Sequence, residues 1–220
     1  MAGDPEVLLT RGQASTAAPG WRYLLGRLQI WLKFPAFTDA VAFVDEVARL
    51  AEDAQHHPEI DLRYNRVPLA TSSHDVGGIT VRDTRLANAL SDLAGRWGAV
   101  VEPASLTELE IAIDTMDLQV IRPFWKAVLG YQEDGDDALA DPRLLGPAVW
   151  FQQLAEPRPV RNRIHLDVTV AHDEAEARIA AALAAGGRLV SDEEAPSFWI
   201  LVDADGNEAC ICTWQGRDPG

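Results

Sequence analysis

Two segments in the second half of the chain share one pattern, and this repeat constrains the fold more than any other feature. LEIAIDTMD (109–117) and IHLDVTVAHD (164–173) both alternate apolar and polar residues, as strands do. Each segment is followed by an acidic residue, a helical pattern and further strand-like segments. The repeat therefore predicts two β-α-β-β-β units in tandem over residues 107–216.

The two helices of these units have separate start and stop signals. Proline is tolerated near the first helical position, so we expect the first helix to begin just before Pro123 and to end at Gly130. The second helix, EAEARIAAALAAGG, stops at the pair Gly186-Gly187. The DADGN run (203–207) predicts a turn between the last two strands.

The first half of the chain predicts a separate unit over residues 21–101. WRYLL and LQIWLKF predict two strands. Residues 39–54 carry apolar residues at helical spacing, and Thr38 is in position to cap this helix. Pro58 prevents the helix from continuing.

A strand and a helix complete this unit. Residues 60–72 alternate well enough for a strand, and Thr80 with Asp83 forms a capping-box pattern that opens a second helix. Residues 1–20 are rich in Gly, Ala, Ser, Thr and Pro and predict a flexible N-terminal arm. Residues 102–105 predict a linker between the two halves.

Composition excludes some classes of partner. The formal net charge is −15, and the arginines are scattered, so we expect no binding to nucleic acid or to a membrane surface. The N-terminus lacks the basic and apolar segments of a signal peptide, and no apolar run is long enough to span a membrane. Cys210 and Cys212 are too close in sequence to form a good disulfide and predict free thiols. We therefore expect a cytoplasmic protein.

Three of the five histidines lie between residues 51 and 78: His56, His57 and His74. Histidine exchanges protons near neutral pH, so a proton-transfer site is one interpretation. Surface histidines near a helix C-terminus, where a cation is favoured, are the alternative. A metal site is less consistent with the pattern, because adjacent residues rarely aim at one ion and no suitably spaced Cys or carboxylate completes the set.

The run Glu52-x3-His56-His57-Pro58-x5-Tyr64-x9-His74-x8-Asp83 resembles the signature of the pterin-4a-carbinolamine dehydratases. The flanking LQIWLKFPAFTDAVAFVDEVARLAE run is also similar to the strand and long helix of that family. The resemblance covers about residues 20–100. It implies an α+β fold in which a sheet packs against helices on one face. It also implies a hydro-lyase that dehydrates 4a-hydroxytetrahydropterin to the quinonoid dihydropterin, without metal or organic cofactor.

The resemblance implies roles for the residues of the signature. His56 and His74 are the acid/base pair, and His57 binds and orients the pterin substrate. The substrate-binding group comprises Glu52, Pro58, Tyr64 and Asp83. The family usually assembles through its helices, so the resemblance implies a homo-oligomer, either a dimer or a tetramer.

Individual members of the substrate-binding group have alternative readings. Glu52 lies one helical turn before His56 and could orient it, or could be an exposed helix residue. Tyr64 is also consistent with core packing, Pro58 with a structural stop, and Asp83 with helix capping alone.

The tandem units resemble the glyoxalase-like branch of the vicinal oxygen chelate superfamily, on the runs LEIAIDTMD, FWKAVLGY, VWFQQLAEPRPVRNRIHLDV and DADGNEACICTW. The resemblance implies a half-barrel built from two βαβββ units. Founding members bind a divalent metal through the first and last strands of the two units. The positions that correspond here hold Glu110, Gln152, His165 and Cys210, with Glu208 two residues before the cysteine.

A divalent metal held by Glu110, His165 and Glu208 is therefore one expectation for this half. The alternative is that Glu110 is a strand-edge residue and His165 a hydrogen-bonded core histidine. For the whole chain, the leading hypothesis is a pterin dehydratase fused to a glyoxalase-like domain. The alternatives are a small-molecule binding protein, or a metal-dependent lyase, isomerase or dioxygenase whose first domain serves oligomerisation.

Overall fold

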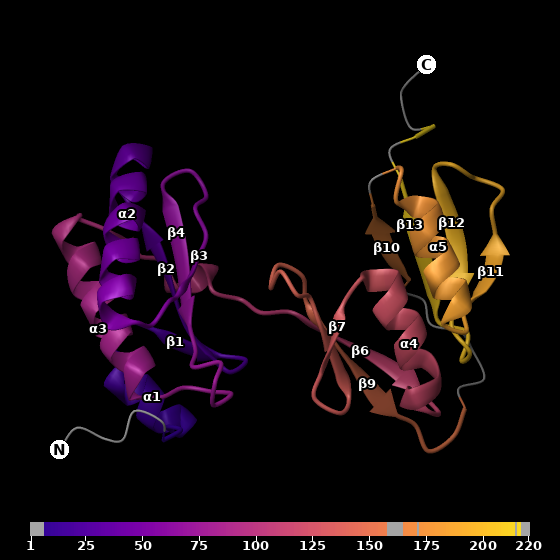
Figure 1. Cartoon of the computed structure of the whole chain (residues 1–220), viewed down its shortest axis with the longest axis horizontal. Helices are drawn as coiled ribbons and strands as arrows, with labels where there is room; N and C mark the ends of the chain where they lie inside the picture. The colour runs from indigo at the N-terminus through magenta and orange to yellow at the C-terminus, as the bar shows by residue number, and fades with distance from the viewer. Residues whose placement is uncertain (1–6, 158–164, 171, 214, 217–220) are drawn as a thin grey trace. The chain divides into compact units, whose positions relative to one another are not determined.

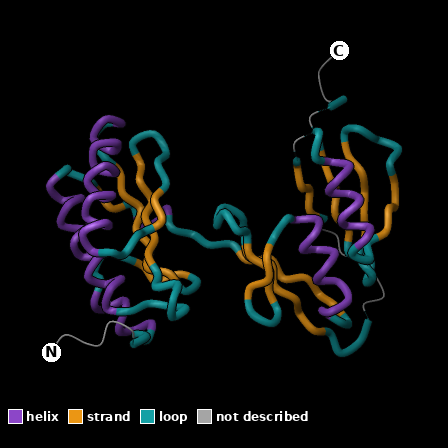
Figure 2. Tube along the Cα trace, in the orientation of Figure 1, coloured by secondary structure: helices purple, strands orange, loops and turns teal. Residues whose placement is uncertain are grey.

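The chain folds into two units in the computed structural model, which describes residues 7–157, 165–170, 172–213 and 215–216. The units comprise Met1–Glu108 and Leu109–Gly220 (Figure 1). The first unit combines helices with one sheet and the second with two, and the sheets are mainly antiparallel, as the α+β expectation requires (Figure 2). Within the described residues, no helix has both the length and the apolar character needed to cross a bilayer.

The first unit is one sheet with helices packed on one face (Figure 1). The strand order is β1-β2-β4-β3, all antiparallel, and β5 also pairs with β2. The strands are β1 (Arg22–Leu24), β2 (Arg27–Lys33), β3 (Glu59–Ile60), β4 (Arg66–Thr71) and β5 (Val100–Val101). The helices are α1 (Arg11–Ala17), α2 (Phe37–Ala54) and α3 (Val81–Arg96), and the 3-10 helix η1 is Pro103–Ser105.

Alternation along β2 creates the core of this unit. Leu28, Ile30 and Leu32 share one face of the strand and are buried. They form one hydrophobic cluster with Phe43 of α2 and Leu90 of α3. Burial of these side chains fixes which faces of the two helices point inward.

The N-terminal segment is the first correction. Residues 1–20 were expected to form a flexible arm, but the described part contains α1. Thr10 and Gln13 make a reciprocal capping box at its start. Ala14 and Ala18 are fully buried in the core cluster. The backbone N–H of Leu9 also donates to the Ile79 carbonyl, so the arm packs on the unit from Leu9 onwards.

Two local predictions in the first unit are also wrong. Residues 60–72 form no single strand, because β3 and β4 pair as a hairpin that turns between Arg63 and Arg66. Helix α2 begins at Phe37 after the N-cap Ala36, which makes no side-chain cap hydrogen bond. Thr38 is therefore inside the helix and does not cap it.

The segment expected to be a linker packs on the sheet of the first unit. The backbone N–H of Glu102 donates to the carbonyl of Trp31, and η1 follows directly. The Glu108 carboxylate accepts hydrogen bonds from Arg27 and Gln29 of β2. These contacts extend the first unit to Glu108.

The second unit contains the two predicted βαβββ modules. The first comprises β6 (Glu110–Thr115), α4 (Leu118–Leu129), β7 (Gln132–Asp134), β8 (Ala138–Ala140) and β9 (Ala148–Gln153). The second comprises β10 (Leu166–Thr169), α5 (Ala175–Ala184), β11 (Arg188–Ser191), β12 (Phe198–Val202) and β13 (Glu208–Cys212). Their sheets have equivalent orders, β6-β9-β8-β7 and β10-β13-β12-β11. In each, the first strand lies parallel to the last.

Pro123 does not mark the start of its helix. Helix α4 begins five residues earlier at Leu118, and Pro123 lies inside it. The Asp117 side chain accepts a hydrogen bond from the Gln119 N–H and caps the first turn. The cap and the buried apolar face of α4 outweigh the hydrogen bond that proline removes.

Side-chain alternation gives each sheet of the second unit two distinct faces. The face covered by the helices contributes Ile113, Ala209 and Ile211 to a core shared with α4 and α5. The opposite face of β10 and β13 carries Asp167 and Cys210, which are paired across the two strands. By the same alternation, Glu110 on β6 and Glu208 on β13, both expected to bind metal, lie on faces away from the helices.

Candidate active site and metal-donor cluster

The end of α2 places the adjacent histidines in opposite environments. Gln55 adopts a left-handed conformation with φ 49° and ends the helix, and the His56 N–H bonds back to Ala51. The His56 side chain turns inward and is 10 % exposed, whereas that of His57 is 59 % exposed. One local turn thus separates a buried histidine from a surface histidine.

His56 contacts the buried carboxylate of Asp83. His56 Nε2 lies 2.7 Å from Asp83 Oδ1, and Asp83 is fully buried at the start of α3. Thr71 Oγ1 donates to the same carboxylate oxygen at 2.8 Å. The other oxygen accepts from Ser73 Oγ at 2.7 Å and from the Thr80 backbone N–H at 2.8 Å.

These donors keep Asp83 ionised. Burial alone raises the pKa of the Asp83 carboxyl, but the hydrogen bonds from Ser73, the Thr80 backbone, His56 and Thr71 outweigh it. The net pKa of Asp83 therefore lies below its ordinary value of 3.8. A charged, fully partnered carboxylate faces the imidazole at neutral pH.

The pair of His56 and Asp83 can hold and release a proton. An ionised Asp83 accepts the Nε2–H of His56, which leaves Nδ1 as the second nitrogen of the neutral ring. The same carboxylate stabilises the imidazolium once Nδ1 takes up a proton. Asp83 is completely buried, so it acts through His56, and the expected contact of Asp83 with substrate is not supported.

Glu52 pairs with His57 and not with His56, which corrects the expected orienting role. Glu52 Oε1 lies 3.1 Å from His57 Nε2, and both side chains are mostly exposed. An exposed pair of this kind contributes little to stability. It holds the His57 ring beside the end of α2, where it can contact a bound molecule.

His74 is exposed and directly follows the network around Asp83. Its neighbour Ser73 donates to Asp83, and the Ser73 backbone forms a bridge with Gly78. Among the contacts recorded for the described residues, none joins His74 to His56 or His57. The structure therefore anchors the chain on either side of His74 without bonding its ring to the other histidines.

Tyr64 lies at the opposite end of α2 from the histidines. It is 73 % exposed, which excludes core packing, and its ring stacks on Phe37 with centroids 6.1 Å apart. Phe37 begins α2 and His56 follows its end, so the helix separates them by about 25 Å. Within one chain, Tyr64 does not share a substrate site with His56. Pro58 is half-buried and lies three residues after Gln55, which ends the helix.

Thr71 and Ser73 are functional candidates that sequence reasoning missed. Both are buried and both donate to Asp83. A signal for them existed, since residues two apart at the end of a strand share one face. That face could be identified only once the strand register was known.

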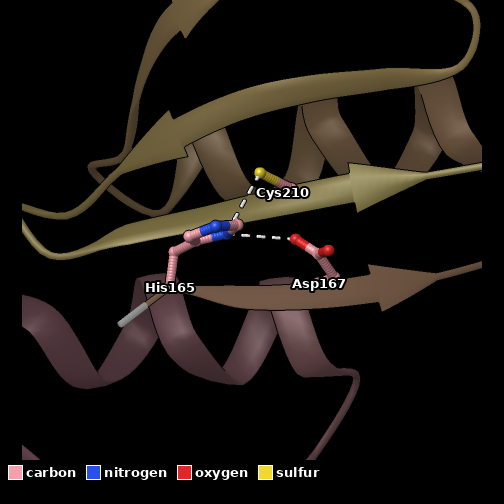
Figure 3. Close-up of side chains that lie close together, drawn as sticks. All are labelled: His165, Asp167 and Cys210. Carbon is pink, nitrogen blue, oxygen red and sulfur yellow. Dashed lines mark hydrogen bonds and ion pairs between the residues drawn. The ribbon is translucent and has the colours of Figure 1, made fainter. Parts of the chain in front are cut away.

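The second unit brings three donor atoms together on the face of β10 and β13 away from the helices (Figure 3). His165 Nδ1 lies 3.1 Å from Asp167 Oδ1 and 3.7 Å from Cys210 Sγ. The three ligand atoms all lie within 4.8 Å of one another. Nitrogen, oxygen and sulfur donors at such separations fit a divalent metal of the zinc type.

This cluster differs from the predicted metal ligands. His165 is in it, but it is half-exposed and is therefore no core histidine. Glu110 and Glu208 are not members, and no second cluster of this kind occurs in the parts of the chain that the structure describes. Asp167 was missed, although it lies two residues after His165 and strand alternation puts both on one face.

Cys210 is the buried member of the cluster and does not form a disulfide. Burial, followed by the nearby Asp167 carboxylate, raises the pKa of its thiol to about 12. In the metal-free protein the thiol is therefore protonated at neutral pH. A thiol in this state is a poor nucleophile, so the arrangement does not support covalent catalysis by Cys210.

Comparisons with known proteins agree with the division into two units. The sequence model of the family described as pterin 4 alpha carbinolamine dehydratase matches residues 8–93. That of the family described as glyoxalase-like domain matches residues 110–212.

The first unit also resembles individual proteins. A protein of Thermomicrobium roseum named "Putative pterin-4-alpha-carbinolamine dehydratase" is 50% identical over 76 residues, which cover 34% of this chain and 82% of the relative. A crystal structure titled transcriptional coactivator/pterin dehydratase, from Brucella melitensis, is 31% identical. It covers 40% of this chain and 100% of its own, with a TM-score of 0.39.

The second unit resembles solved structures at lower identity. A crystal structure from Burkholderia phytofirmans, titled glyoxalase/bleomycin resistance protein/dioxygenase family enzyme, is 18% identical and has a TM-score of 0.39. It covers 47% of this chain and 95% of its own. From the two sequence-model matches and the similarity to the Thermomicrobium protein, the chain belongs to the pterin-4a-carbinolamine dehydratase family and carries a glyoxalase-like domain after its dehydratase domain.

Proposed function

We propose that the first unit dehydrates 4a-hydroxytetrahydropterin to quinonoid dihydropterin by histidine acid/base catalysis. The family membership of the unit supports this reaction. In the reaction the C4a–O bond breaks as the leaving hydroxyl takes up a proton and departs as water. A ring-nitrogen lone pair forms the new C=N bond, and a ring nitrogen loses a proton. The proposal therefore needs one group that gives a proton and one that accepts it.

The contact between His56 and Asp83 is the observation that carries the proposal. His56 is buried, but the ionised Asp83 carboxylate 2.7 Å away stabilises its protonated form. Histidine is the side chain that exchanges protons near neutral pH, so an imidazole held by this contact is suited to exchange a proton with bound pterin. The network that holds Asp83 fixes the ring orientation at the same time.

His74 and His57 have complementary proposed roles. His74 is exposed and lies on the chain next to Ser73, which anchors it beside the Asp83 network. We assign it the second proton transfer. His57 is exposed beside Glu52 and is assigned to binding and orienting the pterin. Neither role requires a metal or an organic cofactor.

Stopped-flow absorbance with enzymatically generated 4a-hydroxytetrahydropterin tests this function. The wild-type chain should accelerate dehydration over the spontaneous rate. His56→Asn and His74→Asn should each lose about 100- to 10,000-fold of that acceleration. His172→Asn, a histidine substitution in the second unit, is the control and should leave it unchanged. A wild-type rate equal to the spontaneous rate would contradict the proposal.

We also propose that the chain forms a homo-oligomer through the start of α2. Phe37 and Val41 lie one helical turn apart and are both more than two-fifths exposed, and Tyr64 stacks on Phe37. Apolar side chains gathered in this way favour association. Light scattering should give a mass of at least two chains for the wild type and a lower mass for Phe37→Ser. A monomeric wild type would contradict this proposal.

A further inference from the structure

We propose that the second unit binds one zinc-type divalent ion through His165, Asp167 and Cys210, a donor set contained within its second βαβββ module. This inference is independent of the dehydratase function proposed for the first unit. It also differs from the expected set of Glu110, His165 and Glu208.

Strand pairing brings the three donors together. Asp167 on β10 and Cys210 on β13 are direct partners across the parallel pair. His165 precedes Asp167 by two residues and shares its face. Figure 3 shows the imidazole beside both the carboxylate and the sulfur, and His165 Nδ1 makes both contacts. The backbone of two adjacent strands therefore fixes the spacing of the donors.

The donor separations match those of a tetrahedral zinc ion. With bonds of about 2.0 Å to nitrogen, about 2.1 Å to oxygen and about 2.3 Å to sulfur, a tetrahedral ion separates nitrogen from sulfur by about 3.5 Å and nitrogen from oxygen by about 3.4 Å. The corresponding separations here are 3.7 Å from His165 Nδ1 to Cys210 Sγ and 3.1 Å to Asp167 Oδ1. Both separations made by the imidazole are therefore close to those of a tetrahedral ion, and all three donor atoms lie within 4.8 Å of one another.

The three donors differ in exposure, so the site is buried on the sulfur side and open to solvent on the other. Cys210 is 5 % exposed, whereas the side chains of His165 and Asp167 are 48 % and 60 % exposed. An ion can therefore enter from solvent and bind to the buried sulfur. Three protein donors leave a fourth position for water or a ligand, as in catalytic rather than structural zinc sites.

The sulfur donor determines which metals fit. Thiolate and imidazole favour zinc, cobalt and related borderline ions, whereas magnesium and calcium prefer sets made of oxygen donors. The carboxylates Glu110 and Glu208 would have favoured the harder ions, and neither joins the cluster. The class of metal therefore follows from the cysteine at position 210.

Metal titration of the full chain tests the proposal. The protein is stripped with chelator, kept reduced and titrated with zinc against a chromophoric competitor. Cobalt is titrated separately, and its thiolate charge-transfer absorption reports directly on sulfur coordination. The ligand variants are Cys210→Ser, Asp167→Asn and His165→Gln; the last two change exposed side chains and should leave the fold intact.

Cys212→Ser is the matched control. Cys212 is also buried and lies two residues along β13 on the same face, but it is outside the cluster. Glu110→Gln and Glu208→Gln distinguish the proposed set from the carboxylate set expected from the sequence.

The expected result is one zinc ion per chain, with affinity reduced at least about 10-fold by each ligand variant. The cobalt charge-transfer band should vanish in Cys210→Ser and persist in Cys212→Ser, Glu110→Gln and Glu208→Gln. The proposal would be overturned by substoichiometric zinc in the wild type. It would equally be overturned if Cys210→Ser and Asp167→Asn kept full affinity, or if Glu110→Gln lost the ion.

Discussion

His56 Nε2 lies 2.7 Å from Asp83 Oδ1, and this contact joins the end of α2 to the start of α3. The same carboxylate closes the capping box of α3 by accepting the Thr80 N–H. One buried side chain thus serves both the local structure of a helix and the position of a proposed catalytic ring. Substitutions at Asp83 should therefore lower the stability of the fold and the dehydration rate together. Substitutions at exposed members of the site can change the rate but should leave the stability unchanged.

The first prediction concerns Asp83→Asn. The amide keeps the shape of the side chain but cannot stabilise a protonated His56 as a carboxylate does. A hydrogen bond to a charged group contributes about 1.5–3 kcal/mol, so the dehydration rate should fall about 10- to 100-fold. Stopped-flow measurement across pH should also show a changed pH–rate profile.

Asp75→Asn is the control for this prediction. Asp75 pairs with Arg82 near the same helix but is exposed and does not contact His56. Its substitution should leave the rate and its pH dependence unchanged. Equal rates for Asp83→Asn and the wild type would show that His56 does not depend on the carboxylate.

The second prediction concerns Glu52→Gln. Because the pair of Glu52 and His57 is exposed, its contribution is about 1 kcal/mol or less. Steady-state kinetics should show a change in kcat/KM below about 5-fold, with more of it in KM than in kcat. A loss as large as that of His56→Asn would mean that Glu52 takes part in the proton transfer itself.

The third prediction concerns the acid stability of the second unit. Hydrogen bonding from Arg143 is the main cause that lowers the pKa of the buried Asp141 from 3.8 to about 2, assisted by the Gly146 N–H. A lowered folded-state pKa stabilises the protein above the unfolded value of 3.8, and this contribution is lost as the pH falls from 3.8 through 2.

Calorimetry of Asp141→Asn checks the direction of this pH dependence of stability. At neutral pH the variant should unfold at a lower temperature than the wild type in the transition of the second unit. The difference should shrink between pH 4 and pH 2, unlike any difference for the exposed control Asp134→Asn. A difference that stays constant over this range would show that the Asp141 charge is not involved.

The fourth prediction concerns Gly187, where α5 ends against α4. A Cβ atom at this position would lie 2.3 Å from Phe124 Cδ2 and 2.8 Å from the Ala182 carbonyl oxygen. Gly187→Ala should therefore destabilise the second unit by about 1–3 kcal/mol through overpacking. Gly95→Ala in α3 meets no atom within 4 Å and should be neutral or stabilising in thermal unfolding. Equal effects of the two substitutions on thermal unfolding would contradict the close approach of Gly187 to Phe124 and Ala182.

The features that could be predicted from the sequence have local signals. Alternation along β6 and β10 predicts the tandem modules, and the capping box of Thr80 and Asp83 predicts the start of α3. These signals depend on residues within a few positions of one another. The family resemblance identified the histidines in the same way, through their spacing along the chain.

The features that could not be predicted depend on contacts between distant segments. Helix α1 is short and its composition resembles a loop, and it is stabilised by burial of Ala14 against the core. Asp83 and His56 are far apart in sequence, so their contact follows only from the packing of α2 and α3. The proximity of Asp167 to Cys210 likewise requires the register of β10 and β13.

The central claim is that His56 exchanges a proton with a pterin carbinolamine. The most direct measurement is the stopped-flow dehydration rate of wild type and His56→Asn at pH 7, with circular dichroism to confirm that both are folded. The account predicts acceleration by the wild type and at least a 100-fold loss of that acceleration in the folded variant, an order of magnitude typical of a lost acid/base group. A folded His56→Asn that dehydrates the carbinolamine as fast as the wild type would contradict it.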